Sequence, residues 1–264
     1  MSVSSHELVT GLSALRLVSH VPVIAHVDVH AFGGLQGGAE TFLQVMSNQV
    51  DTLVMPVFTY RTMVIPAGGP QNNGMRYHRA SGDYSHAEMY DAAMPADPEM
   101  GEVAELLRRN PTAARSEHPV LSFTCTGIDA ALRTQSLDDP LAPIRVLAEL
   151  DGLVLLAGVD QTRNFSLHLA ELMAERKSFT RWALTRDRIV ELRGMPGCSQ
   201  GFNKVSPALR GISRQAKVGK AVISAIPLRA MLRIVYEIIR ADREALLCDA
   251  PACLLCGAVR SAQD

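Results

Sequence analysis

The sequence predicts an α/β fold, because strands and helices alternate along the chain. Short apolar runs near residues 21–28, 51–58, 120–126 and 153–159 are typical of buried strands. Segments with helical periodicity and candidate capping residues lie between them. The chain has 264 residues and no clear linker, so we expect a single domain over 1–264.

The first elements are predicted from caps and apolar runs. A helix near 6–19 follows two serines that can cap it, and a strand near 21–28 comes next. A glycine-rich loop leads into a helix near 39–49. The remaining predicted elements are a strand near 51–58, a long functional loop region over 60–100, a helix near 101–109, strands near 120–126, 153–159 and 188–193, and helices near 206–218 and 228–247.

Composition narrows the class of protein. The net charge is −1 and 47% of the residues are apolar, which gives no support for a nucleic-acid or anionic-membrane partner. No apolar run approaches the ~20 residues of a membrane span. The first residues also lack the basic start and apolar core of a signal peptide. We therefore expect a cytoplasmic protein whose five cysteines are thiols or metal ligands rather than disulfides.

The segment from Asn164 to Glu171 carries the strongest chemical signal. It follows the apolar run 153–159, so it lies past the carboxyl end of a strand, where open α/β sheets place their chemistry. Asn164 or Ser166 can cap a helix there, with His168 in its first turn and Glu171 on the same face. An imidazole with a carboxylate partner is a candidate general base. A packed histidine beside a surface salt bridge is the alternative, and these residues alone leave both open.

His26 is a second candidate, near the end of the first predicted strand. If the strands are parallel, His26 and His168 can converge at one sheet edge, although a core histidine is the commoner case. The glycine loop 33–38 has neither dinucleotide-binding nor P-loop spacing. It does lie between a strand and a helix, where backbone N–H groups can hold an anion, and a tight turn is the alternative.

Charge is distributed unevenly along the chain. Residues 83–105 hold seven carboxylates and no Lys or Arg, which suits a cationic ligand or a solvated face. Residues 204–243 hold nine Lys or Arg and two acids, which suits a solvated face or ligand phosphates. The acidic residues in the first segment are Asp83, Glu88, Asp91, Asp97, Glu99, Glu102 and Glu105.

Four of the cysteines form a candidate metal site. Cys248, Cys253 and Cys256 have the spacing C-x4-C-x2-C, and Cys198 lies in a Gly-Cys-Ser turn. Four thiolates with one pair spaced C-x2-C can hold a tetrahedral structural zinc. Buried thiols in a C-terminal segment are the alternative. Cys125 lies within a predicted strand and is expected in the core.

Six segments match, in order, the motifs of one known family. They span residues 26–40, 55–60, 100–108, 115–122, 150–171 and 197–202. For example, 115–119 matches Arg-Ser-x-His-Pro, and 164–171 matches Asn-Thr-Ser-Leu-His-Leu-Ala-Glu except at Phe165. The chain therefore resembles the aminoglycoside 3-N-acetyltransferase family, also called the antibiotic N-acetyltransferases.

The resemblance implies an acyl-CoA-dependent N-acyltransferase with a mixed central sheet flanked by helices, distinct from the GNAT fold. Acetyl-CoA or another acyl-CoA is the expected co-substrate and a cationic amine the acceptor. His168 is the expected base, with Glu171 orienting it, and His26 is a further catalytic candidate. The residues expected at the CoA site are Gly33, Gly37, Gly38, Ala39, Arg115, Ser116, His118 and Pro119, and those expected at the acceptor are Tyr60, Asp83 and Glu88.

The acceptor is the open question at this point. The 3-amino group of an aminoglycoside, a different amine of a biosynthetic pathway, and a non-catalytic acyl-CoA or cationic-ligand binder are all compatible with the residues. A homodimer is also left open. The chain departs from the family pattern at Asp28, Ala142-Pro143, Asp160 and Phe165, which we expect to line the pocket and to bear on the choice of acceptor.

Overall fold

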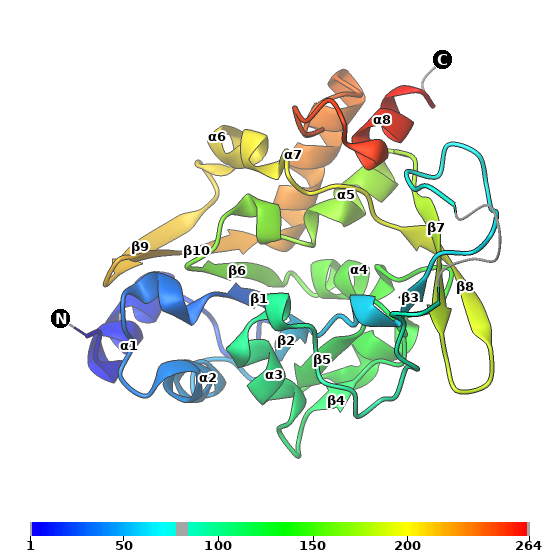
Figure 1. The fold of residues 1–264 in the computed structure, drawn as a ribbon. Coiled ribbons are helices and arrows are strands. Elements are labelled where there is room, and N and C mark those ends of the chain that lie inside the picture. Colours follow the sequence, from blue (N-terminus) through cyan, green and yellow to red (C-terminus); the bar gives the residue numbers. More distant parts are fainter. Residues whose placement is uncertain (1, 78–83, 263–264) are drawn as a thin grey trace.

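The computed structural model describes residues 2–77 and 84–262, and its largest sheet has seven strands within these residues (Figure 1). In spatial order the strands are β4 (Ala114–Arg115), β5 (Phe123–Thr126), β2 (Leu53–Pro56), β1 (Val23–Val27), β6 (Leu153–Ala157), β10 (Ala221–Pro227) and β9 (Arg214–Val218). β1 is parallel to β2 and β6, whereas the outer neighbours pair antiparallel. The predicted mixed α/β sheet is therefore confirmed.

Helices cover both faces of this sheet. Alternate residues of β1 point to opposite faces, so Val23 and Ala25 enter one core and Ile24 enters the other. The first core is covered by α1 (Ser5–Ala14), α2 (Gly38–Ser47) and α3 (Glu102–Arg108). The second core is covered by α4 (Ala142–Glu149), α5 (Leu167–Met173), α7 (Leu228–Ala241) and α8 (Leu254–Arg260). Over residues 2–77 and 84–262, no helix combines the length and apolar character needed to cross a lipid bilayer.

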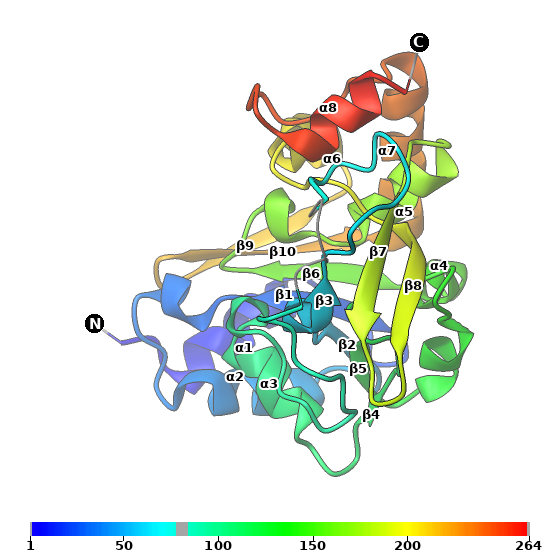
Figure 2. The ribbon, with the colours of Figure 1, turned by 45° about the vertical axis from the view of Figure 1, so that its right-hand side comes forward.

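A smaller antiparallel sheet lies beside the main one. It contains β3 (Met63–Val64), β7 (Phe179–Leu184) and β8 (Ile189–Met195), and Figure 2 shows the β7–β8 hairpin along one side of the molecule. The predicted loop region 60–100 supplies β3 and two 3-10 helices, η2 (Tyr60–Thr62) and η3 (Pro98–Met100). Strand β7 had no counterpart among the predicted elements.

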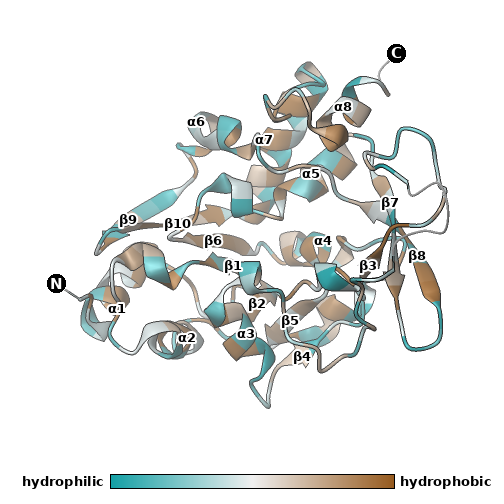
Figure 3. Cartoon of the chain, in the orientation of Figure 1, coloured by the Kyte–Doolittle hydropathy of each residue, from teal (hydrophilic) through white to brown (hydrophobic). Residues whose placement is uncertain are grey.

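The predicted helix over 206–218 is wrong. Only α6 (Ser206–Leu209) is helical there, and the rest of the segment forms β9, which pairs with β10. Gly219 allows the turn between these strands, since its φ is +56° and an added Cβ would lie 2.5 Å from the Phe32 carbonyl oxygen. In Figure 3 β9 is largely hydrophilic and β10 apolar, as expected for an edge strand and its covered neighbour.

Candidate active site

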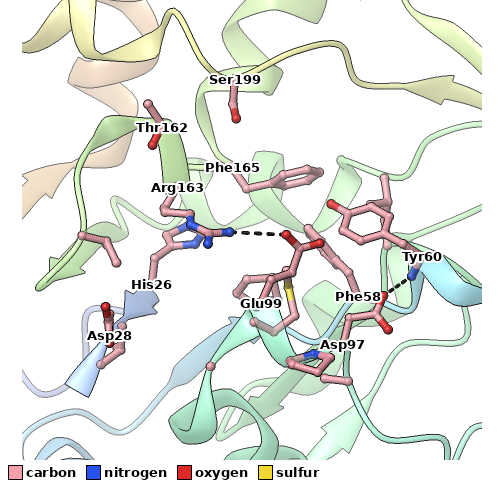
Figure 4. Close-up of a pocket in the computed structure, with 18 of the residues that line it drawn as sticks. His26, Asp28, Phe58, Tyr60, Asp97, Glu99, Thr162, Arg163, Phe165 and Ser199 are labelled. Atoms are coloured by element: carbon pink, nitrogen blue, oxygen red, sulfur yellow. Dashed lines mark hydrogen bonds and ion pairs between the residues drawn. The ribbon is translucent and has the colours of Figure 1, made fainter. Parts of the chain in front are cut away.

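An open cleft of about 1440 Å³ lies where β1, β2 and β6 end. Residues at or just beyond the carboxyl ends of these strands line it, including His26, Phe58 and Val159. Other walls come from η3, from the segment leading into α5, and from the loop after β8 (Figure 4). The volume exceeds the roughly 300–1000 Å³ of most small-molecule pockets, so the cleft can hold two ligands together.

His168 and Glu171 form a buried pair in the first turns of α5. Nδ1 of His168 lies 2.6 Å from Oε2 of Glu171, and the two residues are 4% and 7% exposed. Arg176 donates to the other carboxylate oxygen, Oε1, at 2.7 Å. His168 lines the cleft, so the expected helix position, the pairing and the access to a cavity are all present.

Charge and hydrogen bonding fix the tautomer of the imidazole. Burial by itself would raise the pKa of Glu171, but the hydrogen bond and charge interaction with His168, and then Arg176, bring it below its ordinary value. An ionised carboxylate can only accept, so Nδ1 of His168 carries the proton. Nε2 is then the basic nitrogen. No residue that the structure describes makes a hydrogen bond with it.

Arg176 was not among the predicted site residues. Its guanidinium also donates to the backbone carbonyls of Arg243 at 2.9 Å and Ala245 at 2.7 Å. These acceptors lie 67 and 69 residues further along the chain, so no local spacing could indicate them. The ion pair is therefore held by the segment that follows α7.

Aromatic side chains hold the imidazole in place, and Ser166 stands at the predicted N-cap position of α5 but does not cap it. The ring centroids of Phe165 and Phe202 lie 5.1 Å and 4.8 Å from that of His168. The side chain of Ser166 makes no capping hydrogen bond, and that of Asn164 donates instead to Gln161. A 3-10 turn, η5 (Gln161–Arg163), leads into α5 in their place, with Asp160 as its cap.

His26 lies on the sheet face that α5 covers. It follows Ile24 by two residues, so both point to the same side of β1, and it pairs in register with Leu156 of the parallel strand β6. His26 and His168 therefore line one cleft, as parallel strands predicted. Burial, and then the charge of Arg163, lowers the pKa of His26 to about 3, so its imidazole is neutral at ordinary pH.

One wall of the cleft is rich in carboxylates. We call Asp97, Glu99, Glu102 and Glu105 the acidic wall; all four line the cleft. Asp97 accepts from Arg61 at 2.9 Å and from the backbone N–H of Tyr60, and Glu99 lies 3.6 Å from Arg163 (Figure 4). Two further carboxylates of the lining, Asp28 and Glu40, come from other segments.

The residues predicted for the acceptor fall in different places. Tyr60 lines the cleft, and burial followed by the charges of Glu99 and Asp97 raises the pKa of its phenol. Glu88 is not part of the lining, and it pairs with Arg61 at 3.1 Å. Asp83 lies outside the described residues. The carboxylates of the acidic wall come instead from the carboxyl-terminal part of the predicted acidic segment 83–105.

Of the residues predicted for the CoA site around the glycine loop, Ala39 lines the cleft together with Glu40. Gly33, Gly37 and Gly38 are not in the lining, and they adopt positive φ values of 77°, 71° and 55° that turn the chain into α2. None of the basic side chains at 204–243 lines the cleft either.

The segment from Arg115 to Pro119 lies outside the cleft lining. Arg115 donates to Ser122 at 3.0 Å and to the carbonyls of Ala92 at 3.0 Å and Val57 at 3.1 Å. Pro119 accepts from two threonines of the 59–62 turn. This segment braces the loop that carries the acidic wall.

Two further predicted residues of this segment are also buried. Ser116 accepts from the backbone N–H of Phe123 at 2.9 Å. Nδ1 of His118 accepts from the N–H groups of Val120 and Leu121 at 3.2 and 2.9 Å. Burial lowers the pKa of His118 to about 4.

The family departures are only partly at the cleft. Asp28 and Phe165 line it, as expected. Asp160 does not, because its carboxylate accepts from Thr162 and Asn203. Ala142 and Pro143 are buried in the first turn of α4. The expectation that all these positions line the pocket is therefore wrong for Asp160 and the Ala-Pro pair.

The structure brings the four predicted metal-site cysteines together. The sulfurs of Cys198, Cys248, Cys253 and Cys256 all lie within 4.8 Å of one another. Cys125 is elsewhere, buried in β5 as expected. The grouping of the thiols is thus confirmed, whereas the zinc itself stays a prediction.

Known proteins resemble this chain both in sequence and in fold. Aminoglycoside N(3)-acetyltransferase IV of Salmonella sp is 40% identical over 92 residues, which cover 32% of this chain and 34% of the relative. Aminoglycoside N(3)-acetyltransferase VII of Streptomyces paromomycinus is 32% identical over 184 residues, which cover 66% and 62%. The chain thus matches less than two thirds of the length of either relative.

Solved structures share the fold. The crystal structure of apo aminoglycoside acetyltransferase AAC(3)-IVa has a TM-score of 0.79 at 24% identity and covers 99% of this chain and 98% of that one. AAC-IIIb, solved as a binary complex with CoASH, has a TM-score of 0.72 at 21% identity and covers 91% and 97%. The fold is therefore that of these acetyltransferases and not GNAT. The family described as aminoglycoside 3-N-acetyltransferase matches residues 24–240, and the chain belongs to this family.

Proposed function

We propose that the protein is an acyl-CoA-dependent N-acyltransferase that moves acetyl from acetyl-CoA to the 3-amino group of an aminoglycoside. The observation that carries this proposal is the His168–Glu171 pair, which presents a basic nitrogen to a cleft with an acidic wall. Membership of the family and the CoASH complex of AAC-IIIb support acetyl-CoA as the donor.

The proposed reaction is direct transfer assisted by a general base. Nε2 of His168 takes a proton from the acceptor ammonium, and the freed nitrogen attacks the thioester carbonyl carbon. A carbon–nitrogen bond forms and the carbon–sulfur bond breaks. The nitrogen gives its second proton to the departing thiolate, which leaves as CoASH, and the imidazolium of His168 returns the first proton to solvent. The ionised Glu171 stabilises the imidazolium that forms between these steps. The cleft contributes by holding both reactants together.

The charge of the cleft supports a polycationic acceptor. The acidic wall, Asp28 and Glu40 give six carboxylates in the lining, against the guanidiniums of Arg163 and Arg181. A ligand with several ammonium groups would be attracted to this surface, and its reacting amine would sit opposite the base.

A CoA-release assay with acetyl-CoA and a panel of amines tests the proposal. We expect turnover with 2-deoxystreptamine antibiotics and acetylation at the 3-amino group, identified by mass spectrometry and NMR of the product. Turnover only with unrelated amines would show that the acceptor is not an aminoglycoside. CoA binding without turnover across the panel would show that the protein binds acyl-CoA without catalysing transfer.

A different amine is the second candidate, and Phe165 is the observation that favours it. The family pattern has threonine at this position, whereas here an aromatic ring lines the cleft beside His168. Its centroid lies 4.5 Å from that of Phe58, so the two rings make an apolar surface next to the base. An acceptor with an apolar group beside its amine would fit this surface better than a polyhydroxylated sugar.

A further inference from the structure

Three segments that are distant in sequence meet at the cysteine cluster. Cys198 lies in the loop after β8, Cys248 follows α7, and Cys253 and Cys256 flank the start of α8. Figure 2 shows α8, in red, close to α7. The cluster therefore joins the carboxyl-terminal segment to the loop that follows the β7–β8 hairpin.

We propose that Cys198, Cys248, Cys253 and Cys256 bind one structural zinc ion, and that this ion fixes the 195–200 wall of the cleft to α8. The proposal is independent of the acyltransferase reaction, since the ion has no open coordination position for a substrate. It assigns a role to residues outside the His168 site.

The geometry suits a single tetrahedral ion. Four sulfurs at about 2.3 Å from one zinc lie roughly 3.8 Å apart, and those of this cluster are all within 4.8 Å. Small side-chain rotations would close the remaining difference. A [2Fe–2S] cluster divides four cysteines between two irons and a [4Fe–4S] cluster places each on a different iron, so both separate the cysteine sulfurs further than one ion does. One ion is therefore the better fit.

Backbone N–H groups already point at three of the sulfurs. Gln200 donates to Cys198 at 3.5 Å, the N–H of Cys248 donates to Cys256 at 3.4 Å, and the N–H of Cys256 donates to Cys253 at 3.5 Å. Outer hydrogen bonds of this kind orient metal ligands and stabilise their negative charge. A group of unliganded neutral thiols would gain less from three such donors.

Cationic side chains surround the segment that carries Cys248. Arg260 donates to the Cys248 carbonyl at 3.0 Å, and Lys204 donates to the Leu247 carbonyl at 2.8 Å. One zinc with four thiolates carries a net charge of −2, and these cations offset it only in part, because Arg260 also pairs with Glu244 at 3.1 Å and Lys204 with Asp249 at 2.6 Å. The hydrogen bonds from Arg260 and Lys204 also hold the carbonyls of Cys248 and Leu247 in place when no ion is bound.

The ion would act on the shape of the cleft. Met195, Pro196, Gly197, Ser199 and Gln200 line the cleft on either side of Cys198. Leu255 lines it from α8, between Cys253 and Cys256. Metal bonds to the loop after β8 and to α8 would fix these lining residues relative to each other. Without the ion, the two segments could move apart.

Metal analysis tests the site directly. Wild-type protein purified from zinc-containing medium should carry about one zinc per chain, and Cys198→Ser and Cys253→Ser should each lose most of it. Cys125→Ala is the matched control, because this buried thiol lies outside the cluster and its loss should leave the zinc content unchanged. A folded wild type without zinc, one that carries iron instead, or variants that keep their zinc would overturn the proposal.

Two measurements on the wild-type protein test the zinc site if the serine variants do not fold. Cobalt(II) added to chelator-treated protein should give the absorption bands of tetrahedral thiolate coordination, and their absence would refute the site. Chelation should also accelerate amide exchange in residues 195–201 and 248–260 while leaving α1 protected. Unchanged exchange, or an equal loss of protection in α1, would refute the role of the ion in fixing the wall.

Discussion

The two sides of the cleft differ in how their charges are held. On the α5 side, His168, Glu171 and Arg176 are buried, and each ionised group has a charged or hydrogen-bonded partner. On the acidic wall, Asp97 and Glu105 are also paired with arginines, but Glu99 on η3 and Glu102 at the start of α3 have side chains 49% and 59% exposed. Buried groups have fixed geometry, which acid–base chemistry needs, whereas exposed carboxylates can adapt to cations of different shape.

The largest expected effect is on the α5 side. His168→Ala should lower kcat by ~10²–10⁴-fold, because the reaction loses its general base, while the dissociation constant for CoA stays nearly unchanged. Steady-state kinetics and calorimetric CoA titration measure the two quantities. His20→Ala, at an exposed surface histidine, is the control. Undiminished turnover would remove His168 from its assigned role.

Arg176→Ala should destabilise the fold by roughly 3–5 kcal/mol, because Glu171 would be left buried without its cation. Urea unfolding followed by circular dichroism measures the free energy. The control is Arg133→Ala, which breaks an exposed pair with Asp129 and should cost at most about 1 kcal/mol. Equal costs for the two variants would contradict the difference between buried and exposed charge described above.

The buried neutral histidine in β1 gives stability a pH dependence. The pKa of His26 is about 3 in the folded protein and about 6.5 in the unfolded chain. Below pH 6.5 the unfolded chain takes up a proton that the folded one does not, so the free energy of unfolding falls as pH falls, by up to about 1.4 kcal/mol per unit.

His26→Leu should remove this contribution. Between pH 7 and pH 5, the free energy of unfolding of the variant should therefore fall by about 2 kcal/mol less than that of the wild type. Urea unfolding at the two pH values provides the comparison, with His20→Leu as control. His118 contributes equally to both proteins and cancels. The same loss in wild type and His26→Leu would show that His26 does not titrate in this way.

The smallest expected effect is on the acidic wall. Glu99→Gln should raise the KM for a cationic acceptor a few-fold and leave kcat nearly unchanged, since one half-exposed charge contributes about 0.2–1 kcal/mol. Added salt should reduce the difference between variant and wild type. Glu149→Gln is the control, because Glu149 is exposed and lies outside the cleft lining, so its loss should leave KM unchanged. A larger effect at Glu149 than at Glu99 would place the acceptor outside this cleft.

The α5 side was predictable because its signals are local. The apolar run before Gly158, the spacing of His168 and Glu171, and the position past a strand end are all contained in one short segment. The same locality explains why β1, β2 and β6 were predicted near their observed bounds. Arg176 was missed because the carbonyls that hold it come from a distant segment.

The other parts of the site depend on contacts between distant segments. Nothing local distinguishes Glu88 from Glu99. The loop before η3 is held by contacts with distant segments, among them Arg115 with the carbonyl of Ala92 and Arg61 with the carboxylate of Asp97. For β9 and β10 the misleading signal was Leu209, Ile212 and Ala216, which have helical spacing. Gly219 between two extended runs was the signal for a hairpin.

The long-range bonds of Arg176 bear on the timing of biosynthesis. The carbonyl of Ala245 is translated 69 residues after the guanidinium that it binds. At the ribosome's pace of about 5–20 residues per second, the delay is roughly 3 to 14 seconds. During that interval the nascent polypeptide already contains its imidazole and carboxylate but lacks the acceptors that hold the arginine beside them. If the proposed reaction holds, catalytic competence therefore waits until residue 245 has been added.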